Sequence, residues 1–267
     1  MKMLLTGPRG NLGRELIRNA DFEVIPFGRD DWSNLEAKFS NNIDVVVHAA
    51  SDLRTPASVS PTTLLDSNII TTARIIEAVK RHRIPRLIYI SSCAVYGEDR
   101  NSSEDVQCCP ISINGISKLL NEKVIAEFFQ GTSIQFTILR VFNMYGGDDR
   151  FSIFSHIRHA LENTTPFLLN KRGIAQRDFI HVSDVSKCIL QLLKQKVQYK
   201  HLNIGTGVAT RISDLIDLIK IRNPNLIIQH TDVTDTEYSR ANIGRLSEFV
   251  KFRFYCVKDY LKSGFMS

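Results

Sequence analysis

Three glycines near the N-terminus have the spacing of a phosphate-binding turn. Gly7, Gly10 and Gly13 follow the apolar run Lys2–Thr6 directly and open a helical pattern. The first glycine permits a tight turn, the second lets a diphosphate approach the backbone, and the third lets helix and strand pack closely. A helix N-terminus adds unpaired N–H groups and a positive dipole end. The pattern predicts dinucleotide binding through Gly7, Arg9, Gly10, Asn11 and Leu12.

The residues after the second apolar run bear on which dinucleotide binds. Dinucleotide folds that prefer NAD place an acidic residue here against the ribose hydroxyls, whereas an arginine accommodates the 2′-phosphate of NADP. This chain has Gly28 at that position and Arg29 next. A guanidinium can pair with a phosphate through two parallel hydrogen bonds. Arg29 and Arg9 therefore predict NADP(H); the alternative is NAD, with Asp30 or Asp31 on the ribose.

Short apolar runs alternate with amphipathic segments of helical length along most of the chain. The predicted strands are Lys2–Thr6, Glu23–Phe27, Asp44–Ala49, Arg86–Ser91, Thr137–Val141 and His201–Gly205. The predicted helices are Asn11–Asn19, Thr63–His82, Gly115–Gln130, Phe151–Glu162 and Val182–Lys194. This alternation is typical of an α/β fold of the Rossmann type, a doubly wound parallel sheet covered on both faces. Beyond about Ser213 the pattern is thinner, with a helix at Ser213–Lys220, an extended piece at Leu226–Gln229 and a short C-terminal helix.

Six motifs occur in order between residues 6 and 205. They are TGPRGNLG at 6–13, HAA at 48–50, SSCAVYG at 91–97, RVFNMYG at 140–146, RDFIHV at 177–182 and HLNIG at 201–205. The sequence resembles the extended short-chain dehydrogenase/reductase family, the NAD(P)-dependent nucleotide-sugar epimerases, dehydratases and reductases. The resemblance implies a dinucleotide-binding domain at 1–147 and 176–205, and a small substrate-binding subdomain at 148–175 and 206–267. It also adds cofactor contacts at Ala49, Ala50, Ser51 and Ser91.

The family uses a Ser or Thr hydroxyl, with a tyrosine and a lysine in a YxxxK pattern. The resemblance assigns the hydroxyl to Ser92 and the lysine to Lys118, which would also hold the nicotinamide ribose. The pattern P-x3-Y-G-x-S-K is kept from Pro110 onward, except that Asn114 stands in the tyrosine's place. An amide does not titrate near neutral pH, although it can hydrogen-bond a carbonyl or an oxyanion.

Another group must then move the proton if the chain is an enzyme. Cys93, beside Ser92, is our leading candidate for this group. The alternative proton donors are Ser112, Tyr96, Tyr145 or a water held by Asn114. For the two tyrosines, the alternative to proton transfer is a packing role. The dehydratases of the family carry Asp-Glu directly after the catalytic hydroxyl residue. Here those positions are Cys and Ala, which disfavours a 4,6-dehydratase.

The resemblance also implies a substrate site. Asn143 matches the asparagine that binds the nucleotide diphosphate, and Arg177 matches the arginine that pairs with it. His181 in the same motif is expected to be a packed histidine. These matches predict an NADP(H)-dependent oxidoreductase or epimerase acting on a nucleotide-diphosphate sugar, such as a keto or 6-deoxy sugar. The alternative, favoured by Asn114, is a catalytically silent dinucleotide-binding protein with a regulatory or scaffolding role.

Composition limits the remaining classes. The net charge of +6 is spread over the chain without a Lys/Arg run, so nucleic-acid binding is not expected. The five cysteines have no metal-ligand spacing, and we expect no metal, no disulfides and a reducing cytoplasm. No apolar stretch reaches the length of a membrane span, and the N-terminal run is too short for a signal peptide. The apolar surface of Gly115–Gln130, with Leu119, Leu120, Val124, Ile125 and Phe128, and its neighbour Thr63–His82, predict a homodimer.

Overall fold

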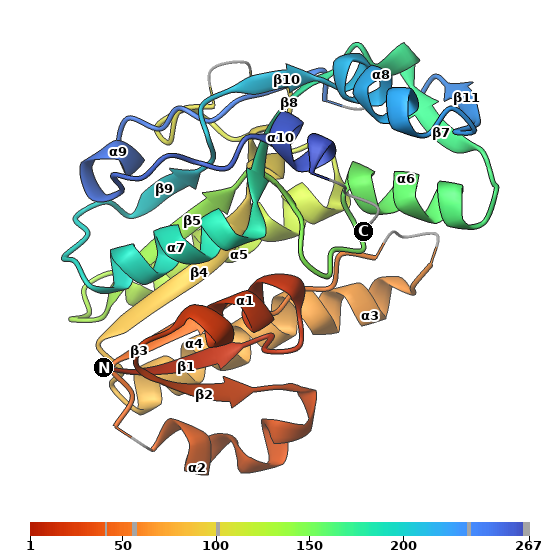
Figure 1. Ribbon diagram of the computed structural model, residues 1–267. Helices are drawn as coiled ribbons and strands as arrows, with labels where there is room; N and C mark the ends of the chain where they lie inside the picture. The colour runs from red at the N-terminus through yellow and green to blue at the C-terminus, as the bar shows by residue number, and fades with distance from the viewer. Residues whose placement is uncertain (41, 55–57, 100–101, 234–235, 264–267) are drawn as a thin grey trace.

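Six of the apolar runs form one parallel sheet, with strand order β2-β1-β3-β4-β5-β9 (Figure 1). The computed structural model describes residues 1–40, 42–54, 58–99, 102–233 and 236–263. The strands are β1 (Lys2–Thr6), β2 (Glu23–Phe27), β3 (Val45–His48), β4 (Arg86–Ser92), β5 (Gln135–Val141) and β9 (His201–Ile204). Every neighbouring pair runs parallel. The predicted Rossmann-type α/β fold is confirmed.

Both faces of this sheet are buried under helices. Met3 and Leu5 of β1 pack in the cluster that contains α1 (Asn11–Asn19) and α7 (Val182–Leu193). Leu4, which lies between Met3 and Leu5, packs in the cluster on the opposite face, which contains α4 (Thr71–Arg81) and α5 (Ile113–Phe129). Figure 1 shows these helices on the sheet. Because side chains alternate across a strand, burial on both faces makes the run continuously apolar.

The predicted helix Thr63–His82 is three helical segments in succession. α3 (Pro61–Leu65) leads into the π-helical turn η2 (Asp66–Ile70), and α4 follows. A π turn leaves backbone groups of a helix without their usual partners. Here the Asn68 carbonyl oxygen accepts hydrogen bonds from Asn121 Nδ2 at 2.9 Å and from Thr72 Oγ1 at 2.7 Å. Both bonds come from side chains, which hydrophobic periodicity does not reveal.

A second, smaller sheet lies beyond the carboxyl ends of the main strands, and sequence periodicity missed it. It contains β6 (Asn143–Tyr145), β8 (Gln176–His181), β10 (Ala209–Arg211) and β12 (Tyr238–Ser239), with β7 (Phe167–Asn170) and β11 (Ile228–Thr231) as a separate pair. The helices α6 (Ile153–Glu162), α8 (Ile212–Arg222) and α10 (Val257–Lys262) pack with these strands around a third core cluster. The proposed division into two domains stays a prediction.

Several predicted bounds were wrong by a few residues. The helix expected at Phe151–Glu162 begins at Ile153, because the Ser152 hydroxyl caps it and accepts from the Phe154 and Ser155 N–H groups. The other differences are the ends of β3, β4, β5, β9, α5, α7 and α8, and the extended piece at Leu226–Gln229, which is displaced to β11. The remaining short elements are η1 (Arg29–Asn34), α2 (Leu35–Phe39), η3 (Cys93–Tyr96), η4 (Lys171–Gly173) and α9 (Leu246–Phe249). Among the described residues, no helix is long and apolar enough to cross a bilayer.

Candidate active site

The glycine turn has the close contacts that only glycine allows. Gly7 has φ +72°, and a Cβ there would lie 2.9 Å from the Ala50 backbone nitrogen. A Cβ at Gly13 would lie 2.1 Å from the Gly7 carbonyl oxygen. Helix α1 begins after Gly10, and no side chain caps it. Its first N–H groups therefore remain available to an anion, which fits the diphosphate of a dinucleotide.

The two residues after Gly10 contribute backbone rather than side chain to this turn. Leu12 is buried in the core under α1. The Asn11 carboxamide donates to the Gly146 carbonyl at 2.8 Å and accepts from the Asp148 N–H at 3.0 Å. These bonds tie the turn to the loop after β6.

The end of β2 presents arginines and no uncommitted acid. Asp31 accepts from the Gly28 N–H at 2.7 Å, and this hydrogen bond is the main reason that the pKa of Asp31 is lowered. Asp30 pairs with Arg9 at 3.0 Å, at the surface. In the alternative with NAD, Asp30 or Asp31 would bind the ribose with a carboxylate that already has one of these partners. A Cβ at Gly28 would meet Arg9 and Asp31 only at 3.6 Å, so a side chain fits there. Arg29 is exposed.

The HAA segment is held by buried polar contacts on both sides. His48 lies between the hydroxyls of Thr6, at 2.6 Å, and Thr72, at 3.0 Å, and burial lowers its pKa to about 3. The Ala50 N–H donates to Thr6 Oγ1 at 3.1 Å. Ser51 Oγ donates to the Asn68 carboxamide oxygen at 3.2 Å. The neutral histidine thus fixes the loop that carries the predicted cofactor contacts Ala49, Ala50 and Ser51.

Asn68 and Asn121 were missed by the sequence analysis. The Asn68 side chain accepts from the Asp52 N–H at 2.7 Å and donates to the Asp52 carbonyl at 3.0 Å. Asn121 Nδ2 also lies 2.9 Å from the Tyr89 hydroxyl. The signal that could have found Asn68 is its place on the apolar face of its helix, four residues before the buried Thr72.

Two further glycines bring α5 against the turn after β4. A Cβ at Gly115 would lie 2.4 Å from the Ala94 carbonyl oxygen, and one at Gly97 would lie 1.9 Å from the Cys109 carbonyl oxygen. Ser112 caps α5, accepting from the Gly115 N–H at 3.1 Å. This packing places Asn114 and Lys118, from the first turns of α5, beside the end of β4 that carries Ser92.

Lys118 is buried beside β4. Its Nζ donates to the Ile90 carbonyl oxygen at 2.8 Å and lies 4.9 Å from the centre of the Tyr89 ring. Burial lowers the pKa of Lys118 to about 8, while the charge of Glu122 acts in the opposite direction. The neighbouring Ser91 donates its hydroxyl to Glu122. The Ser91 side chain is therefore occupied by Glu122, so the predicted contact between Ser91 and the cofactor would be made by the Ser91 backbone.

Asn114 carries an unsatisfied buried atom. Its carboxamide oxygen is buried and has no hydrogen-bond partner among the described residues. A buried acceptor without a donor costs about 1–3 kcal/mol, so native proteins rarely leave one unpaired. The position where the family pattern has a tyrosine therefore presents an acceptor for which the described residues supply no donor.

A cavity of about 210 Å³ adjoins this edge. It is lined by Cys93, Ala94, Tyr96, Gly97, Ser102, Ile111, Ser112, Asn143, Arg177, Thr236, Tyr238 and Ser239. Arg177 is 7% exposed and donates to the carbonyl oxygens of Gln176, at 3.1 Å, and Thr236. The Asn143 amide donates to the Asp178 carbonyl at 2.8 Å. The structure thus brings the two predicted substrate residues to one cavity.

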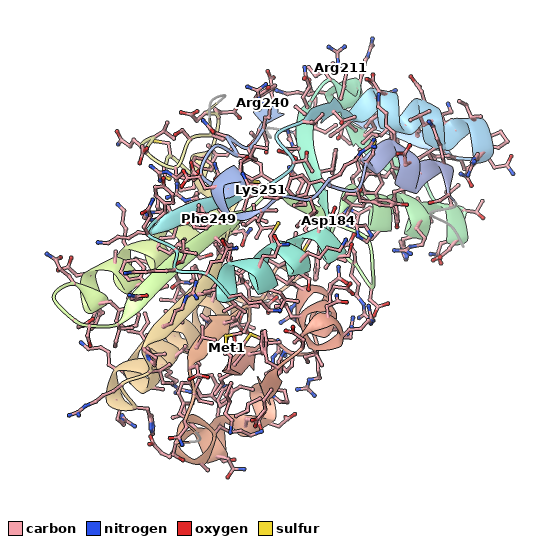
Figure 2. The ribbon with its side chains drawn as sticks, turned by 60° about the vertical axis from the view of Figure 1, so that its left-hand side comes forward. Met1, Asp184, Arg211, Arg240, Phe249 and Lys251 are labelled. Atoms are coloured by element: carbon pink, nitrogen blue, oxygen red, sulfur yellow. The ribbon has the colours of Figure 1, made fainter. Side chains whose placement is uncertain are left out.

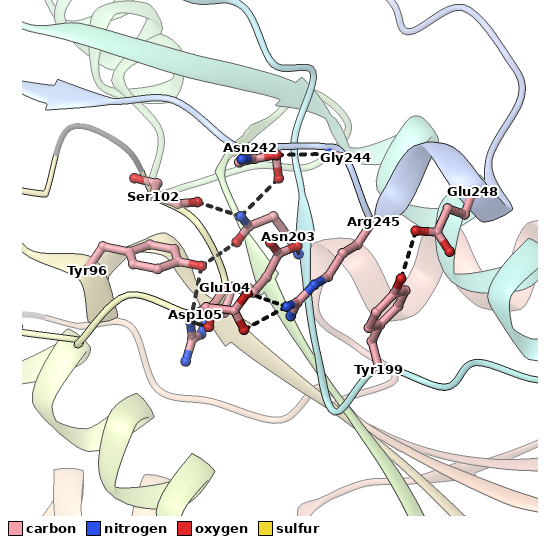
Figure 3. A network of polar contacts seen from close by, with 11 residues as sticks. Tyr96, Ser102, Glu104, Asp105, Tyr199, Asn203, Asn242, Gly244, Arg245 and Glu248 are labelled. Carbon is pink, nitrogen blue, oxygen red and sulfur yellow. Dashed lines mark hydrogen bonds and ion pairs between the residues drawn. The ribbon is translucent and has the colours of Figure 1, made fainter.

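The candidate proton donors lie in different surroundings. Burial raises the pKa of the Cys93 thiol to about 11, although the hydrogen bond from Ser239 lowers this pKa. Cys93 therefore lines the cavity as a neutral thiol. The Tyr96 hydroxyl donates to Asn203 Oδ1 at 2.6 Å, in a buried network (Figure 3). Tyr145 packs among aromatic rings outside this cavity. His181 caps α7, as expected of a structural histidine.

Comparison with known proteins identifies the family. The sequence model of the NAD dependent epimerase/dehydratase family matches residues 3–205. A putative UDP-glucose 4-epimerase of Methanocaldococcus jannaschii is 33% identical over 253 residues, covering 82% of this chain and 81% of that protein. The chain belongs to the NAD dependent epimerase/dehydratase family.

Solved structures share the fold of nearly the whole chain. MoeE5, solved with UDP-glucuronic acid and NAD, superposes with a TM-score of 0.88 at 23% identity, over 98% of this chain and 97% of that one. The UDP-glucose 4-epimerase of Thermotoga maritima, solved with UDP-glucose, has a TM-score of 0.86 at 21% identity, over 98% and 96%. The family match ends at residue 205, so the segment that includes Thr236, Tyr238 and Ser239 lies outside it.

Proposed function

We propose that this epimerase/dehydratase family member catalyses dinucleotide-dependent epimerisation or reduction of a nucleotide-diphosphate sugar. The cavity that contains Asn143 and Arg177 is also lined by Cys93 and Ser112, which lie next to Ser92 and two residues before Asn114 in the chain, and this arrangement carries the proposal. A guanidinium at the edge of the cavity can hydrogen-bond a diphosphate through parallel N–H groups. The names of the relatives, UDP-glucose 4-epimerases among them, favour a UDP-sugar and epimerisation.

The residues present suggest how the chemistry is divided. The bound dinucleotide supplies hydride transfer, and Lys118 holds its ribose hydroxyls. The Ser92 hydroxyl hydrogen-bonds the reacting sugar oxygen. During oxidation the proton of the sugar hydroxyl would pass to a water that donates to the unpartnered Asn114 oxygen and from that water to solvent, and during reduction it would return by the same route. In this assignment Cys93 contacts the sugar as a neutral thiol, because its pKa near 11 makes it a weak acid at neutral pH.

We also propose a preference for NADP(H) over NAD(H). It is supported by Gly28 at the end of β2, by the exposed Arg29 and by Arg9. Asp31 is bonded to the Gly28 N–H and Asp30 to Arg9, so Arg29 is the arginine that we expect to meet the additional phosphate first. We further propose that the protein assembles as a homodimer. We also propose that it works in a reducing cytoplasm, because its five cysteines are free thiols.

The decisive assay incubates the protein with UDP-glucose, UDP-N-acetylglucosamine or UDP-glucuronic acid and either oxidised dinucleotide. Epimers are separated by chromatography, and a parallel panel of 4-keto nucleotide sugars with NADPH is followed by absorbance. Turnover is expected in one panel, and Ser92→Ala should lower it about 100-fold or more, as for loss of a hydrogen bond to the reacting oxygen. Turnover that is unchanged in Ser92→Ala would contradict the assigned site.

Asn114 favours a second candidate function, a catalytically silent dinucleotide-binding protein. This second function predicts that NADPH and a UDP-sugar both bind in calorimetry, while no substrate of either panel is turned over. Binding of the dinucleotide without any UDP-sugar would remove the substrate assignment from both functions.

A further inference from the structure

A second cavity lies near the C-terminal end of the chain. Its volume is about 820 Å³, within the range of about 300–1,000 Å³ typical of ligand pockets. Its lining shares no residue with the candidate active-site cavity, although β8 contributes to both. It is lined by Gln176, Phe179, Thr206, Val208, Ala209, Thr210, Arg211, Asp214, Phe252, Arg253, Phe254, Tyr255, Cys256, Val257 and Lys258.

The apolar wall of this cavity is held in place from several sides. Phe252 and Phe254 pack edge to face with ring centres 5.1 Å apart. The Tyr255 N–H donates to the carboxylate of Asp184 on α7 at 2.5 Å. Val257 is buried in the third core cluster. The segment therefore forms a fixed wall against β8 and β10, and binding does not require it to fold first.

Cationic side chains surround the apolar wall. Arg211, Arg253 and Lys258 are exposed, and none of them forms an ion pair with another described residue. Figure 2 labels Arg211 at the top of the molecule, directly before α8. Asp214 is the one acidic residue in the lining. The cavity thus combines an apolar body with an excess of two positive charges, which favours an anionic ligand.

We propose that this cavity binds a small amphipathic anion. An aromatic or acyl body would pack on Phe179, Phe252 and Phe254, and a carboxylate or phosphate head would meet Arg211, Arg253 or Lys258. The site is separate from the dinucleotide turn and from the proposed sugar site, so the inference stands whether or not the proposed activity is found.

The test uses 8-anilinonaphthalene-1-sulfonate as an amphipathic anion, with the full chain and saturating NADPH. Fluorescence should saturate at one site per chain, and uncharged N-phenyl-1-naphthylamine should bind more weakly. Decanoate and decyl phosphate should compete, and the better competitor identifies the head group. If NADPH abolishes the saturable signal, the probe occupies the dinucleotide site and the proposal is wrong.

Two sets of variants separate a charged site from a nonspecific apolar surface. Arg211→Gln, Arg253→Gln and Lys258→Gln together should lower the affinity about tenfold or more, because each removes a charge-assisted contact. The matched control changes Lys123, Lys196 and Lys220 to Gln, which are exposed, lie outside the lining and alter the net charge equally. Val208→Trp, at a position 63% exposed, should block the cavity without lowering Tm. Equal affinity in both triple variants would overturn the proposal.

Discussion

At the scale of single residues, Asn114 separates an active enzyme from a silent binder. Asn114→Tyr restores a phenol one helical turn from Lys118, whose positive charge would lower the phenol pKa. If the site merely lacks a proton donor, the variant should gain about 100-fold in turnover, the usual contribution of general acid–base catalysis. If a water on the Asn114 oxygen already moves the proton, the ring displaces it and turnover falls. The measurement is initial rate on the nucleotide-sugar panel, with Ser92→Ala as the inactive reference.

We expect residues at the end of β2 to set the proposed cofactor preference. Arg29→Ala should reduce the affinity for NADPH about 10–100-fold and leave NADH unchanged, as expected for loss of a charged contact of about 1.5–3 kcal/mol. Gly28→Asp should act in the opposite direction and favour NADH, because a side chain fits there and a carboxylate can bind the ribose hydroxyls. Both effects are read by titration calorimetry. Equal affinities of the wild type for the two cofactors would refute the preference.

The lowered pKa of Lys118 connects its burial to stability. The folded chain releases this proton near pH 8, while an unfolded lysine holds it to about 10.5. Between these values the unfolded state binds more protons, so the Lys118 contribution makes the free energy of unfolding rise with pH. Urea unfolding at pH 7.5 and at pH 9.5 should show this rise in the wild type and a smaller one in Lys118→Met. Identical pH dependences would place the pKa of Lys118 near its ordinary value.

At the scale of elements, a buried ion pair joins α5 to β5. Arg140 lies 2.7 Å from Glu122, and both side chains are at most 5% exposed. Arg140 also donates to the Tyr96 hydroxyl, which in turn donates to Asn203 (Figure 3). Tyr96, the tyrosine of the SSCAVYG motif, therefore connects the turn after β4 to β9, and its hydroxyl proton is held in a buried hydrogen bond. Its role is to position that turn.

Breaking this pair should destabilise the fold strongly. Glu122→Gln leaves the Arg140 charge buried without its counter-ion, and we expect a loss of about 3–5 kcal/mol in the free energy of unfolding. Asp105→Asn is the control, because Asp105 pairs with Arg245 near the same network but is 77% exposed (Figure 3). An exposed pair contributes about 0–1 kcal/mol. Urea unfolding measures the free energy of unfolding of both variants. Equal losses of this free energy in Glu122→Gln and Asp105→Asn would show that the buried charge of Arg140 is compensated elsewhere.

At the scale of the whole molecule, α5 offers a dimer contact that differs from the predicted one. Ile125, expected on the outer surface, is fully buried against the sheet. Of the predicted residues, Leu120 and Phe128 are 44% and 53% exposed, and Ile113 and Ile116, both 50% exposed, are the other large exposed apolar residues of α5. Ile116, Leu120 and Phe128 follow one face at helical spacing. A stripe of this kind on a soluble protein favours association.

The dimer is tested by placing a charge in this stripe. Leu120→Glu should convert a dimer into a monomer in light scattering at micromolar concentration, because a carboxylate would be buried without a partner. Ile221→Glu is the matched control: Ile221 is 77% exposed on α8 and should leave the mass unchanged. A monomeric wild type would contradict the prediction directly.

The sequence by itself determined the features that depend on local pattern. The central strands of the large sheet are largely apolar because both their faces are buried. The glycine turn is recognisable because the spacing of its three glycines is local, although Gly7 also packs against Ala50. The fold and the family followed from these patterns and the ordered motifs. Asn143 and Arg177, which were predicted residue by residue, both line the candidate cavity, and the roles assigned to Ser92 and Lys118 stay predictions.

Tertiary structure decided what depends on residues far apart in the chain. Strand β8 contains the buried Arg177 and Asp178, which do not look like a strand until their partners are known. The Asp178 carboxylate accepts N–H groups of Thr206, Gly207 and Ala241, so its burial depends on segments at least 28 residues away. The orphaned oxygen of Asn114 and the C-terminal cavity likewise exist only once distant segments pack, because a buried polar group is satisfied or left unsatisfied by its neighbours in space.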